Sequence, residues 1–245
     1  MTIYAVGDIH GYPDKLDRAL KLIEADGGQH AQIVFVGDYI DRGPDSRAVI
    51  ERLIEGLEEG RPWTCLKGNH DRIMEWFLED QPRQDPHLLV GFHWFHEMIG
   101  GLPTMASYGV DVSERERLFL VHARAREAVP QSHIDFLRSL KLTHQQDDYL
   151  FVHAGIRPGI PIEAQDERDL VWIRDEFLNY RRPFPKLVVH GHTPVDSPAH
   201  LGNRVNLDGG AAFGRPLVPV ALEGKKAYAL TDKGRAELKP LGSRL

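Results

Sequence analysis

The chain has 245 residues and a net charge of −6, from 30 Lys and Arg against 36 Asp and Glu. This length can bury a core without cross-links, and the single cysteine, Cys65, excludes an internal disulfide and a cysteine-rich zinc site. The mild acidity argues against a nucleic-acid partner, and no apolar run approaches the roughly 20 residues of a membrane helix.

The first 70 residues alternate between two kinds of pattern. Continuous apolar runs rich in β-branched residues are typical of strands buried on both faces, whereas apolar residues spaced three and four apart are typical of helices. In chain order the predicted elements are a strand at 3–6, a helix at 12–25, a strand at 33–36, a helix at 46–57 and a strand at 63–67. This order predicts a layered α/β fold.

The remainder of the chain changes character twice. Residues 72 to about 147 contain helical stretches at 71–79 and 133–140, broken by several prolines, and we interpret them as a mostly helical insertion. Strand patterns then return at 149–152, 187–190, 204–207, 217–222 and 226–230, the last two joined by a predicted hairpin turn. We expect residues 1–245 to form a single domain that carries this insertion between two strands of its sheet.

Five predicted strands end in the same way, with a glycine close to a side chain that can bind a metal ion. In open α/β sheets, ligands bind where the carboxyl ends of strands meet, so these side chains are predicted to converge. They are Asp8, His10, Asp38, Asn69, His153 and His192. This mixture of carboxylate, imidazole and amide ligands suits Mn²⁺, Fe or Zn²⁺. One glycine–aspartate pair is also a common turn, but five such ends favour a metal centre, and six ligands with one shared carboxylate fit two ions.

The same strand ends are parts of longer motifs. The motifs are Gly7-Asp8-Ile9-His10-Gly11, Gly37-Asp38-Tyr39-Ile40-Asp41-Arg42-Gly43, Gly68-Asn69-His70-Asp71, His153-Ala154-Gly155 and Gly191-His192-Thr193. In order and spacing they resemble the motif set of the phosphoprotein phosphatase family, which belongs to the calcineurin-like metallophosphoesterases. The resemblance spans residues 4 to about 220 and implies a central mixed β-sandwich flanked by helices, with two metal ions at one edge.

The resemblance also implies a role for each ligand. It gives the first ion Asp8 and His10, makes Asp38 the bridge between both ions, and gives the second ion Asn69, His153 and His192. His190 is a rival to His192, but the family motif places the ligand directly after the glycine, which favours His192. We expect two divalent cations, with Mn²⁺ as the first choice and Fe or Zn²⁺ as alternatives.

Four further residues are candidates for the catalytic chemistry. Asp41 and His70 resemble the family's Asp–His pair, in which the carboxylate orients the imidazole and the imidazole protonates a leaving alkoxide. Arg42 is expected to hold phosphate oxygens, because a guanidinium matches a phosphate bidentately. In the family a second phosphate-binding arginine lies between the last two histidine motifs, and Arg174 is the candidate here, with Arg157 as the alternative.

These features together predict a dinuclear-metal phosphomonoesterase that works by in-line attack of a metal-bridging hydroxide. Asp41 favours a Ser/Thr protein phosphatase, because serine and threonine alkoxides are poor leaving groups and the family's dinucleotide enzymes commonly lack this aspartate. The alternatives are a symmetrical bis(5′-nucleosyl)-tetraphosphatase, a broad-specificity phosphatase and a metal-binding scaffold without activity. We expect a phosphoprotein or another phosphoester as the partner, and a cytoplasmic location because the first residues lack a secretory signal.

Two features of the insertion remain open from the sequence. Trp76 and Trp94 are interpreted as core residues of the insertion, although aromatic rings can also stack on nucleobases. The segment with Gly100-Gly101, Thr104 and Ser107-Tyr108-Gly109 resembles one found in bacterial members of the family, and we expect it to line the substrate cleft.

Overall fold

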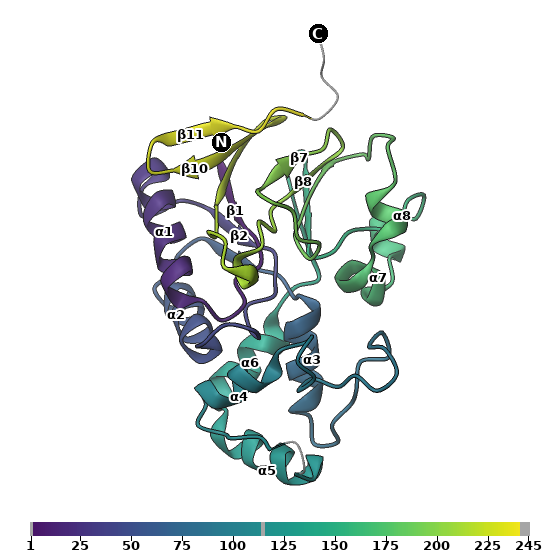
Figure 1. The fold of residues 1–245 in the computed structure, drawn as a ribbon. Helices are drawn as coiled ribbons and strands as arrows, with labels where there is room; N and C mark the ends of the chain where they lie inside the picture. The colour runs from purple at the N-terminus through teal and green to yellow at the C-terminus, as the bar shows by residue number, and fades with distance from the viewer. Residues whose placement is uncertain (1, 114–115, 241–245) are drawn as a thin grey trace.

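The described part of the chain, residues 2–113 and 116–240 of a computed structural model, contains two β-sheets that face each other (Figure 1). The first sheet has the strand order β11-β10-β9-β1-β2-β3 and the second has the order β4-β5-β6-β8-β7. The strands of the first sheet are β1 (Ile3–Val6), β2 (Ile33–Phe35), β3 (Trp63–Cys65), β9 (Val220–Glu223), β10 (Lys226–Thr231) and β11 (Gly234–Glu237). Those of the second are β4 (Thr143–Gln146), β5 (Tyr149–Val152), β6 (Leu187–His190), β7 (Ala199–His200) and β8 (Arg204–Asn206).

The central strands are apolar throughout because both of their faces are buried. Neighbouring side chains along a strand point to opposite faces of the sheet. Ile3 and Ala5 of β1 share a core with Phe151 of β5, which lies between the two sheets. Tyr4 and Val6 of β1 belong instead to the core under the helices that cover the first sheet. This double burial explains the continuous apolar runs in the sequence.

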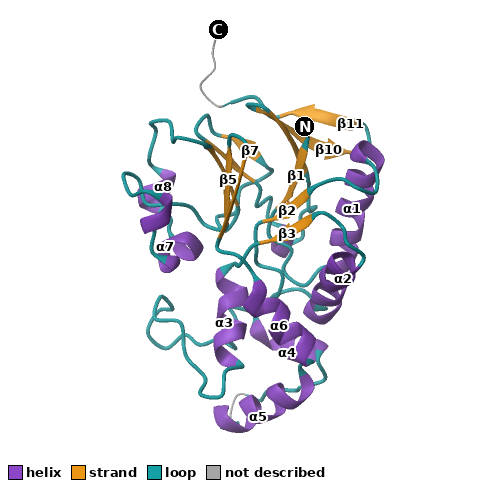
Figure 2. Ribbon diagram, turned by 180° about the vertical axis from the view of Figure 1, so that it is seen from behind, coloured by secondary structure: helices purple, strands orange, loops and turns teal. Residues whose placement is uncertain are grey.

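Helices cover both outer faces of the sandwich, and a further group of helices lies at one end of it (Figures 1 and 2). The first sheet is covered by α1 (Pro13–Gly27) and α2 (Ser46–Glu58), and the second by α7 (Glu167–Trp172) and α8 (Asp175–Leu178). The group at the end consists of α3 (Asn69–Phe77), α4 (Gly101–Ser107), α5 (Leu118–Ala128) and α6 (Gln131–Ser139). Short 3-10 turns occur at Ile162–Ala164 and Ala211–Phe213. Of the described helices, none combines the length and the apolar character needed to cross a bilayer.

The predicted α/β sandwich with flanking helices is confirmed, with differences at several strands. The sequence patterns did not predict β7 and β11. The strand expected at 217–222 begins only at Val220, because Pro219 has no N–H to give to a neighbouring strand. Residues Thr143–Gln146, expected in the helical insertion, form the edge strand β4 of the second sheet. Their polar sequence, Thr-His-Gln-Gln, carries no apolar alternation, because none of these four edge-strand residues is buried.

Candidate active site

The predicted metal ligands follow strands whose carboxyl ends lie at the same edge. In the first sheet β1, β2 and β3 run parallel, and in the second β5, β6 and β8 run parallel. The carboxyl ends of the three strands in each set therefore lie at the same edge of their sheet. All six predicted ligands are buried at this edge, with exposed fractions of 5 % or less. These side chains are Asp8, His10, Asp38, Asn69, His153 and His192.

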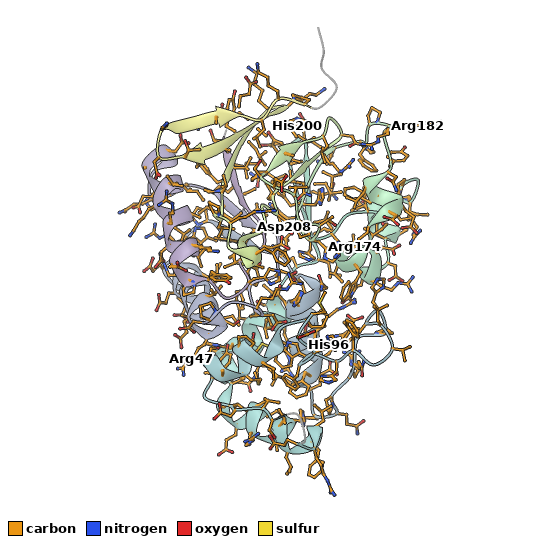
Figure 3. All side chains as sticks on the ribbon, viewed as in Figure 1. Arg47, His96, Arg174, Arg182, His200 and Asp208 are labelled. Atoms are coloured by element: carbon orange, nitrogen blue, oxygen red, sulfur yellow. The ribbon has the colours of Figure 1, made fainter. Side chains whose placement is uncertain are left out.

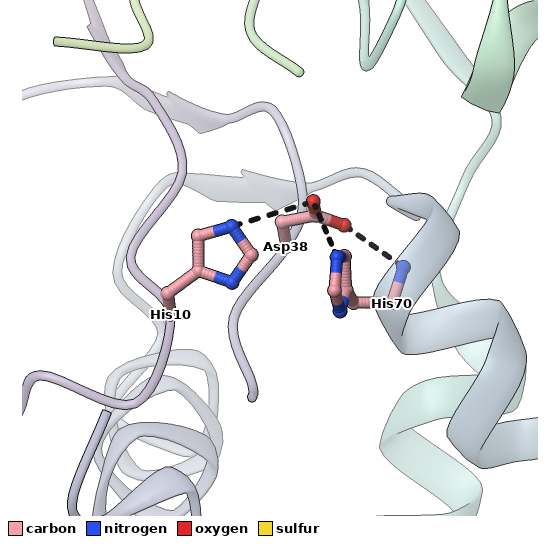
Figure 4. A group of neighbouring side chains, drawn as sticks. All are labelled: His10, Asp38 and His70. Carbon is pink, nitrogen blue, oxygen red and sulfur yellow. Dashed lines mark hydrogen bonds and ion pairs between the residues drawn. The ribbon is translucent and has the colours of Figure 1, made fainter. Parts of the chain in front are cut away.

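Asp38 lies at the centre of the arrangement (Figure 4). Its Oδ2 is 3.7 Å from Nε2 of His10, 4.0 Å from Nε2 of His70 and 3.4 Å from Nε2 of His153. Its Oδ1 accepts a hydrogen bond of 3.0 Å from the backbone N–H of His70, in the first turn of α3. The helix dipole favours a negative charge at this position.

Asp71 holds the loop that carries Asp38. Its Oδ2 accepts hydrogen bonds of 2.8 Å from the backbone N–H groups of Asp38 and Gly68, and its Oδ1 accepts one of 3.0 Å from Tyr39. The loops after β2 and β3 are therefore fixed to each other through one buried carboxylate.

Two groups of three side chains bring their ligand atoms within 4.8 Å of one another in the part of the chain that the structure describes. The first group is His10, Asp38 and His70, and the second is Asp38, His153 and His192. Asp38 belongs to both groups, the position that a bridging carboxylate would need. A metal–ligand bond is about 2.0–2.2 Å long, so two ligand atoms of the same ion lie closer together than about 4.5 Å. Small side-chain movements would therefore let each group hold one ion.

Backbone carbonyls fix the orientation of two of these histidines. Nδ1 of His10 donates to the carbonyl oxygen of Ile40 at 2.8 Å, and Nδ1 of His153 donates to that of Val36 at 2.9 Å. A histidine that donates through one nitrogen presents the other for metal binding. In both residues the nitrogen left for a cation is Nε2, which faces Asp38.

Three predicted residues lie differently from their expected assignment. Asp8 is in neither group; both of its carboxylate oxygens accept from the backbone N–H of His192, at 3.1 and 3.0 Å. Oδ1 of Asn69 lies 3.0 Å from Nε2 of His153, beside the second group. His70, expected to act as an acid, supplies the third ligand atom of the first group.

The charges of the site act strongly on one another. Burial raises the pKa of Asp38, but His153 and His70 outweigh burial and hold it well below its usual value. Burial lowers the pKa of His153, but Asp38 and Asp8 outweigh it and raise this pKa to about 9. Burial and then Arg42 lower the pKa of His10 well below its usual value. A proton on His153 therefore competes with a cation for Nε2, while His10 is available as a neutral ligand.

Glycines allow the loops to approach the ligands closely. A Cβ atom on Gly68 would lie 2.1 Å from Oδ1 of Asp38, and one on Gly191 would lie 2.0 Å from Oδ1 of Asp8. Neither position has room for a side chain, so these glycines are needed for packing against a carboxylate.

Several residues of the site have left-handed backbone conformations. Among the described residues, six that are not glycine have a positive φ, and only Asp147 of these six lies outside the predicted site. The others are His10 (φ 51°), Asp38 (55°), Asp41 (71°), Arg42 (70°) and His192 (64°). Such conformations are uncommon outside glycine and gather at functional sites.

Asp41 and His70 form a buried pair beside the first group. Nδ1 of His70 donates to Oδ2 of Asp41 at 2.6 Å. Arg42 lies across this pair, because its Nη1 donates to Nε2 of His10 at 3.0 Å and its Nη2 donates to Nε2 of His70 at 3.2 Å. The predicted acid pair and the predicted phosphate ligand are thus in direct contact with each other.

The structure separates the two candidates for the second arginine. Arg174, labelled in Figure 3, lines the same cavity as His192, and its Nη1 donates to Oγ1 of Thr193 at 3.2 Å. Arg157 forms hydrogen bonds of 2.6 and 3.0 Å to the carboxylate of Asp169 and does not line this cavity. The geometry therefore favours Arg174.

A cavity of about 230 Å³ opens onto the candidate ligands. Asp38, Asn69 and His192 line one side of it. The opposite wall comes from the insertion and is mostly apolar; it comprises Leu88, Leu89, Phe92, Met98 and Ile99. The ring of His87 stacks on Trp172 at the rim, with centroids 4.7 Å apart. A second, larger cavity of about 570 Å³ lies next to Phe184 and Lys225 and contains none of the predicted site residues.

His190, the last residue of β6, and His192, two residues beyond it, point in different directions. The ring of His192 lies 5.1 Å from that of His153. Nε2 of both His190 and His192 is buried without a hydrogen-bond partner in the described part of the chain, so the ring contacts are what distinguish them. The ring of His190 packs at 5.0 Å against Phe177 of α8, and burial lowers its pKa to about 3. His190 thus faces the outer core, whereas His192 faces the candidate metal site.

We expect His192→Ala to lose most of one bound metal equivalent and to lower kcat by about a hundredfold, because outer-shell changes alone already cost about 10–100-fold. His190→Ala is expected to keep its bound metal, although removal of a buried ring lowers its stability. Metal content of the folded protein by elemental analysis checks both. Loss of metal from His190→Ala alone would reverse the assignment.

Three residues near the site were not among the predicted ligands or catalytic residues. Thr104 belongs to the segment expected to line the substrate cleft, but none of residues 100–109 lines the cavity beside the candidate ligands. Asp208 (Figure 3) follows β8, is 5 % exposed and, after burial, is the main cause of the raised pKa of Asp8. A similar sequence signal was present, because Asp208 stands next to a glycine shortly after a strand, although it precedes its glycine whereas most predicted ligands follow theirs. Thr104 and Trp94 contact Asp41, and neither has a local pattern that announces this contact.

A family model for calcineurin-like phosphoesterases matches residues 1–213 of the chain. The chain is 27 % identical to the asymmetrical bis(5′-nucleosyl)-tetraphosphatase PrpE of Oceanobacillus iheyensis, over 95 % of this chain and 93 % of that protein. It is also 27 % identical to serine/threonine-protein phosphatase 1 of Salmonella typhimurium, over 88 % of this chain and 89 % of that protein.

A solved structure described as a putative diadenosine tetraphosphatase has a similar fold. The two structures superpose with a TM-score of 0.59 at 18 % identity, over 99 % of this chain and 95 % of the other. At this identity the likeness concerns the fold alone.

Proposed function

This protein belongs to the calcineurin-like phosphoesterase family, and from that premise we propose that it hydrolyses phosphoesters with two divalent cations, Mn²⁺ being the first choice. The proposed ligands are Asp8, His10, Asp38, Asn69, His153 and His192. Residues 1–245 are proposed to form one domain, in which the helical insertion supplies a wall of the cavity. We keep Fe and Zn²⁺ as alternative ions because the donor set accepts them as well.

The residues present fit a pair of cations. Their ligand atoms converge in two groups that share Asp38. Nε2 of His192 is buried without a hydrogen-bond partner in the described residues, which costs about 1–3 kcal/mol that a cation would relieve. When bound, two cations supply an activated water molecule and neutralise charge on the phosphate oxygens.

The chain's own residues then divide the remaining work. Arg42 and Arg174 line the cavity and are proposed to donate to phosphate oxygens, Arg42 by turning its guanidinium from the histidine rings to the substrate. His70 is proposed to protonate the leaving oxygen through Nε2, while Asp41 holds the ring through Nδ1. A general acid of this kind contributes about 10²–10⁴-fold to the rate.

The Asp41–His70 pair is the observation that carries the substrate proposal. A buried carboxylate 2.6 Å from the imidazole is arranged for protonating a poor leaving group. Serine and threonine alkoxides are poor leaving groups, whereas a polyphosphate chain leaves readily. We therefore propose phosphoserine and phosphothreonine in proteins as the substrate class.

Dinucleoside tetraphosphates are the second candidate. They are favoured by the aromatic groups at the cavity, where His87 stacks on Trp172. They are also favoured by the tetraphosphatase activity for which the Oceanobacillus relative is named, since that protein matches along nearly the whole chain. Stacked aromatic rings can bind nucleobases.

A metal-reconstitution assay tests the proposal. We expect the chelated protein to be inactive and Mn²⁺ to restore activity, with a higher kcat/KM on a phosphothreonine peptide than on a dinucleoside tetraphosphate. A preference of about a hundredfold for the dinucleotide, about 2.7 kcal/mol in transition-state binding, would replace the first substrate by the second. Full activity after chelation would contradict the two-metal proposal itself.

A further inference from the structure

The carboxylate of Asp41 has more partners than a two-residue acid pair requires. Besides His70, it accepts a hydrogen bond of 2.7 Å from Oγ1 of Thr104 to Oδ1. Nε1 of Trp94 lies 3.0 Å from both carboxylate oxygens and donates to them. Asp41 is fully buried and Trp94 and Thr104 are at most 4 % exposed. Both added donors come from the insertion and from outside the predicted motifs.

The hydroxyl groups of Ser46 and Thr104 form a hydrogen-bond network with Asp41. Oγ1 of Thr104 gives its only proton to Asp41, so the 2.9 Å contact between the Ser46 and Thr104 hydroxyls must be donated by Ser46. The backbone N–H of Asp41 donates to both hydroxyl oxygens, at 3.1 and 3.0 Å. Backbone and side chain of Asp41 are thus held by the same two hydroxyls, although its φ of 71° is unfavourable.

The donors around Asp41 also determine which nitrogen of His70 faces the cavity. The indole N–H of Trp94 can only donate a hydrogen bond, and the hydroxyl of Thr104 already donates its proton to Asp41. The carboxylate of Asp41 therefore accepts hydrogen bonds from both residues. His70 completes the set by donating through Nδ1. Nε2 of His70 is then the nitrogen that faces Asp38 and the cavity.

We propose that Trp94 and Thr104 are positioning residues for the reaction, which hold the Asp41 carboxylate so that His70 directs Nε2 at the leaving oxygen of the substrate. This rests on the proposed function, in which His70 is the acid. Neither residue lines the cavity together with the ligands, so both act through Asp41. The insertion therefore completes the acid pair as well as walling the cavity.

A purely structural role is the competing explanation, because Trp94 also packs against Phe77 and Phe95. The two roles differ in their dependence on the leaving group. A positioned acid matters for an alkoxide, which needs a proton, and matters little for 4-nitrophenolate, which does not. Loss of general structure slows both substrates alike.

The experiment compares Thr104→Val and Trp94→Phe with two matched controls, in the Mn²⁺-loaded full chain. Thr104→Ser keeps the hydroxyl, and Phe95→Leu alters the same aromatic cluster without touching Asp41. We expect Thr104→Val and Trp94→Phe to lower kcat on a phosphothreonine peptide by about tenfold, as for a lost hydrogen bond to a charged group. Their kcat on 4-nitrophenyl phosphate and their KM should stay within about twofold of wild type.

The controls are expected to keep the wild-type ratio of the two kcat values. Equal losses on both substrates, or no loss on the peptide, would overturn the inference, and so would a Thr104→Ser variant as impaired as Thr104→Val. If one variant does not fold, as judged by its melting curve, the other decides. The wild-type enzyme separates this result from failure of the proposed function, because an inactive wild type rejects the function before any variant is compared.

Discussion

Exchange of Asp38 for asparagine is expected to lower kcat/KM by about a thousandfold or more, equivalent to about 4 kcal/mol of transition-state stabilisation. The carboxylate is shared by both candidate metal groups, so one substitution weakens two sites at once. A neutral amide supplies a single weak oxygen ligand and leaves the positive charges of two cations without their common counter-charge.

Metal content and steady-state kinetics of the purified variant measure this effect. Asp196→Asn is a suitable control, because it makes the same chemical change in a side chain that is 97 % exposed and belongs to neither candidate metal group. The control should retain both its metal and its turnover. An Asp38→Asn protein that keeps two metal equivalents and wild-type turnover would show that the bridge has been assigned to the wrong residue.

Removal of the His70 imidazole is expected to reduce kcat on a phosphothreonine peptide by about a thousandfold, within the range attributed to general acids. Asp41→Asn should cost a large part of the same factor, because an amide at the position of Oδ2 no longer accepts properly from Nδ1 of His70. The double variant should be little worse than the more damaging single variant, since residues that act as a unit give non-additive losses.

The leaving group provides the control for this pair. On 4-nitrophenyl phosphate the losses should be much smaller, because its leaving group needs no proton. His70 also belongs to the first candidate metal group, so metal content must be measured beside the kinetics. Additive losses, or equal losses on both substrates with lost metal, would identify His70 as a ligand instead of an acid.

The sequence predicts the strand ends well because each signal is local. A buried strand, a glycine and a metal-binding side chain occupy a few consecutive residues, and parallel strands bring such segments together without further information. The backbone carbonyls that orient the rings of His10 and His153 belong to Ile40 and Val36, which lie in the same strand-end segments. Asp208 carried a similar local signal, with its glycine after it instead of before it.

Contacts made across the chain could not be predicted in this way. Trp94 and Thr104 reach Asp41 from 53 and 63 residues away, and nothing near them in sequence distinguishes them from core residues of a helical insertion. The edge strand β4 has no apolar period because none of its four residues is buried. The substrate is hardest to predict, since the wall of the cavity comes from an irregular loop rather than from a strand or helix.

The left-handed residues of the site bear on how much change the rest of the protein tolerates. Each such residue costs on the order of 1–2 kcal/mol relative to ordinary backbone, although Asp and His bear it better than Arg42. Five of them take up several kcal/mol, against a net unfolding free energy on the order of 5–15 kcal/mol for a typical domain. The sandwich core must supply that excess, so selection for turnover also acts on buried residues that never meet the substrate. Relatives that no longer catalyse the reaction would be expected to replace these residues by ones with ordinary backbone conformations, and to accept more substitutions in the core.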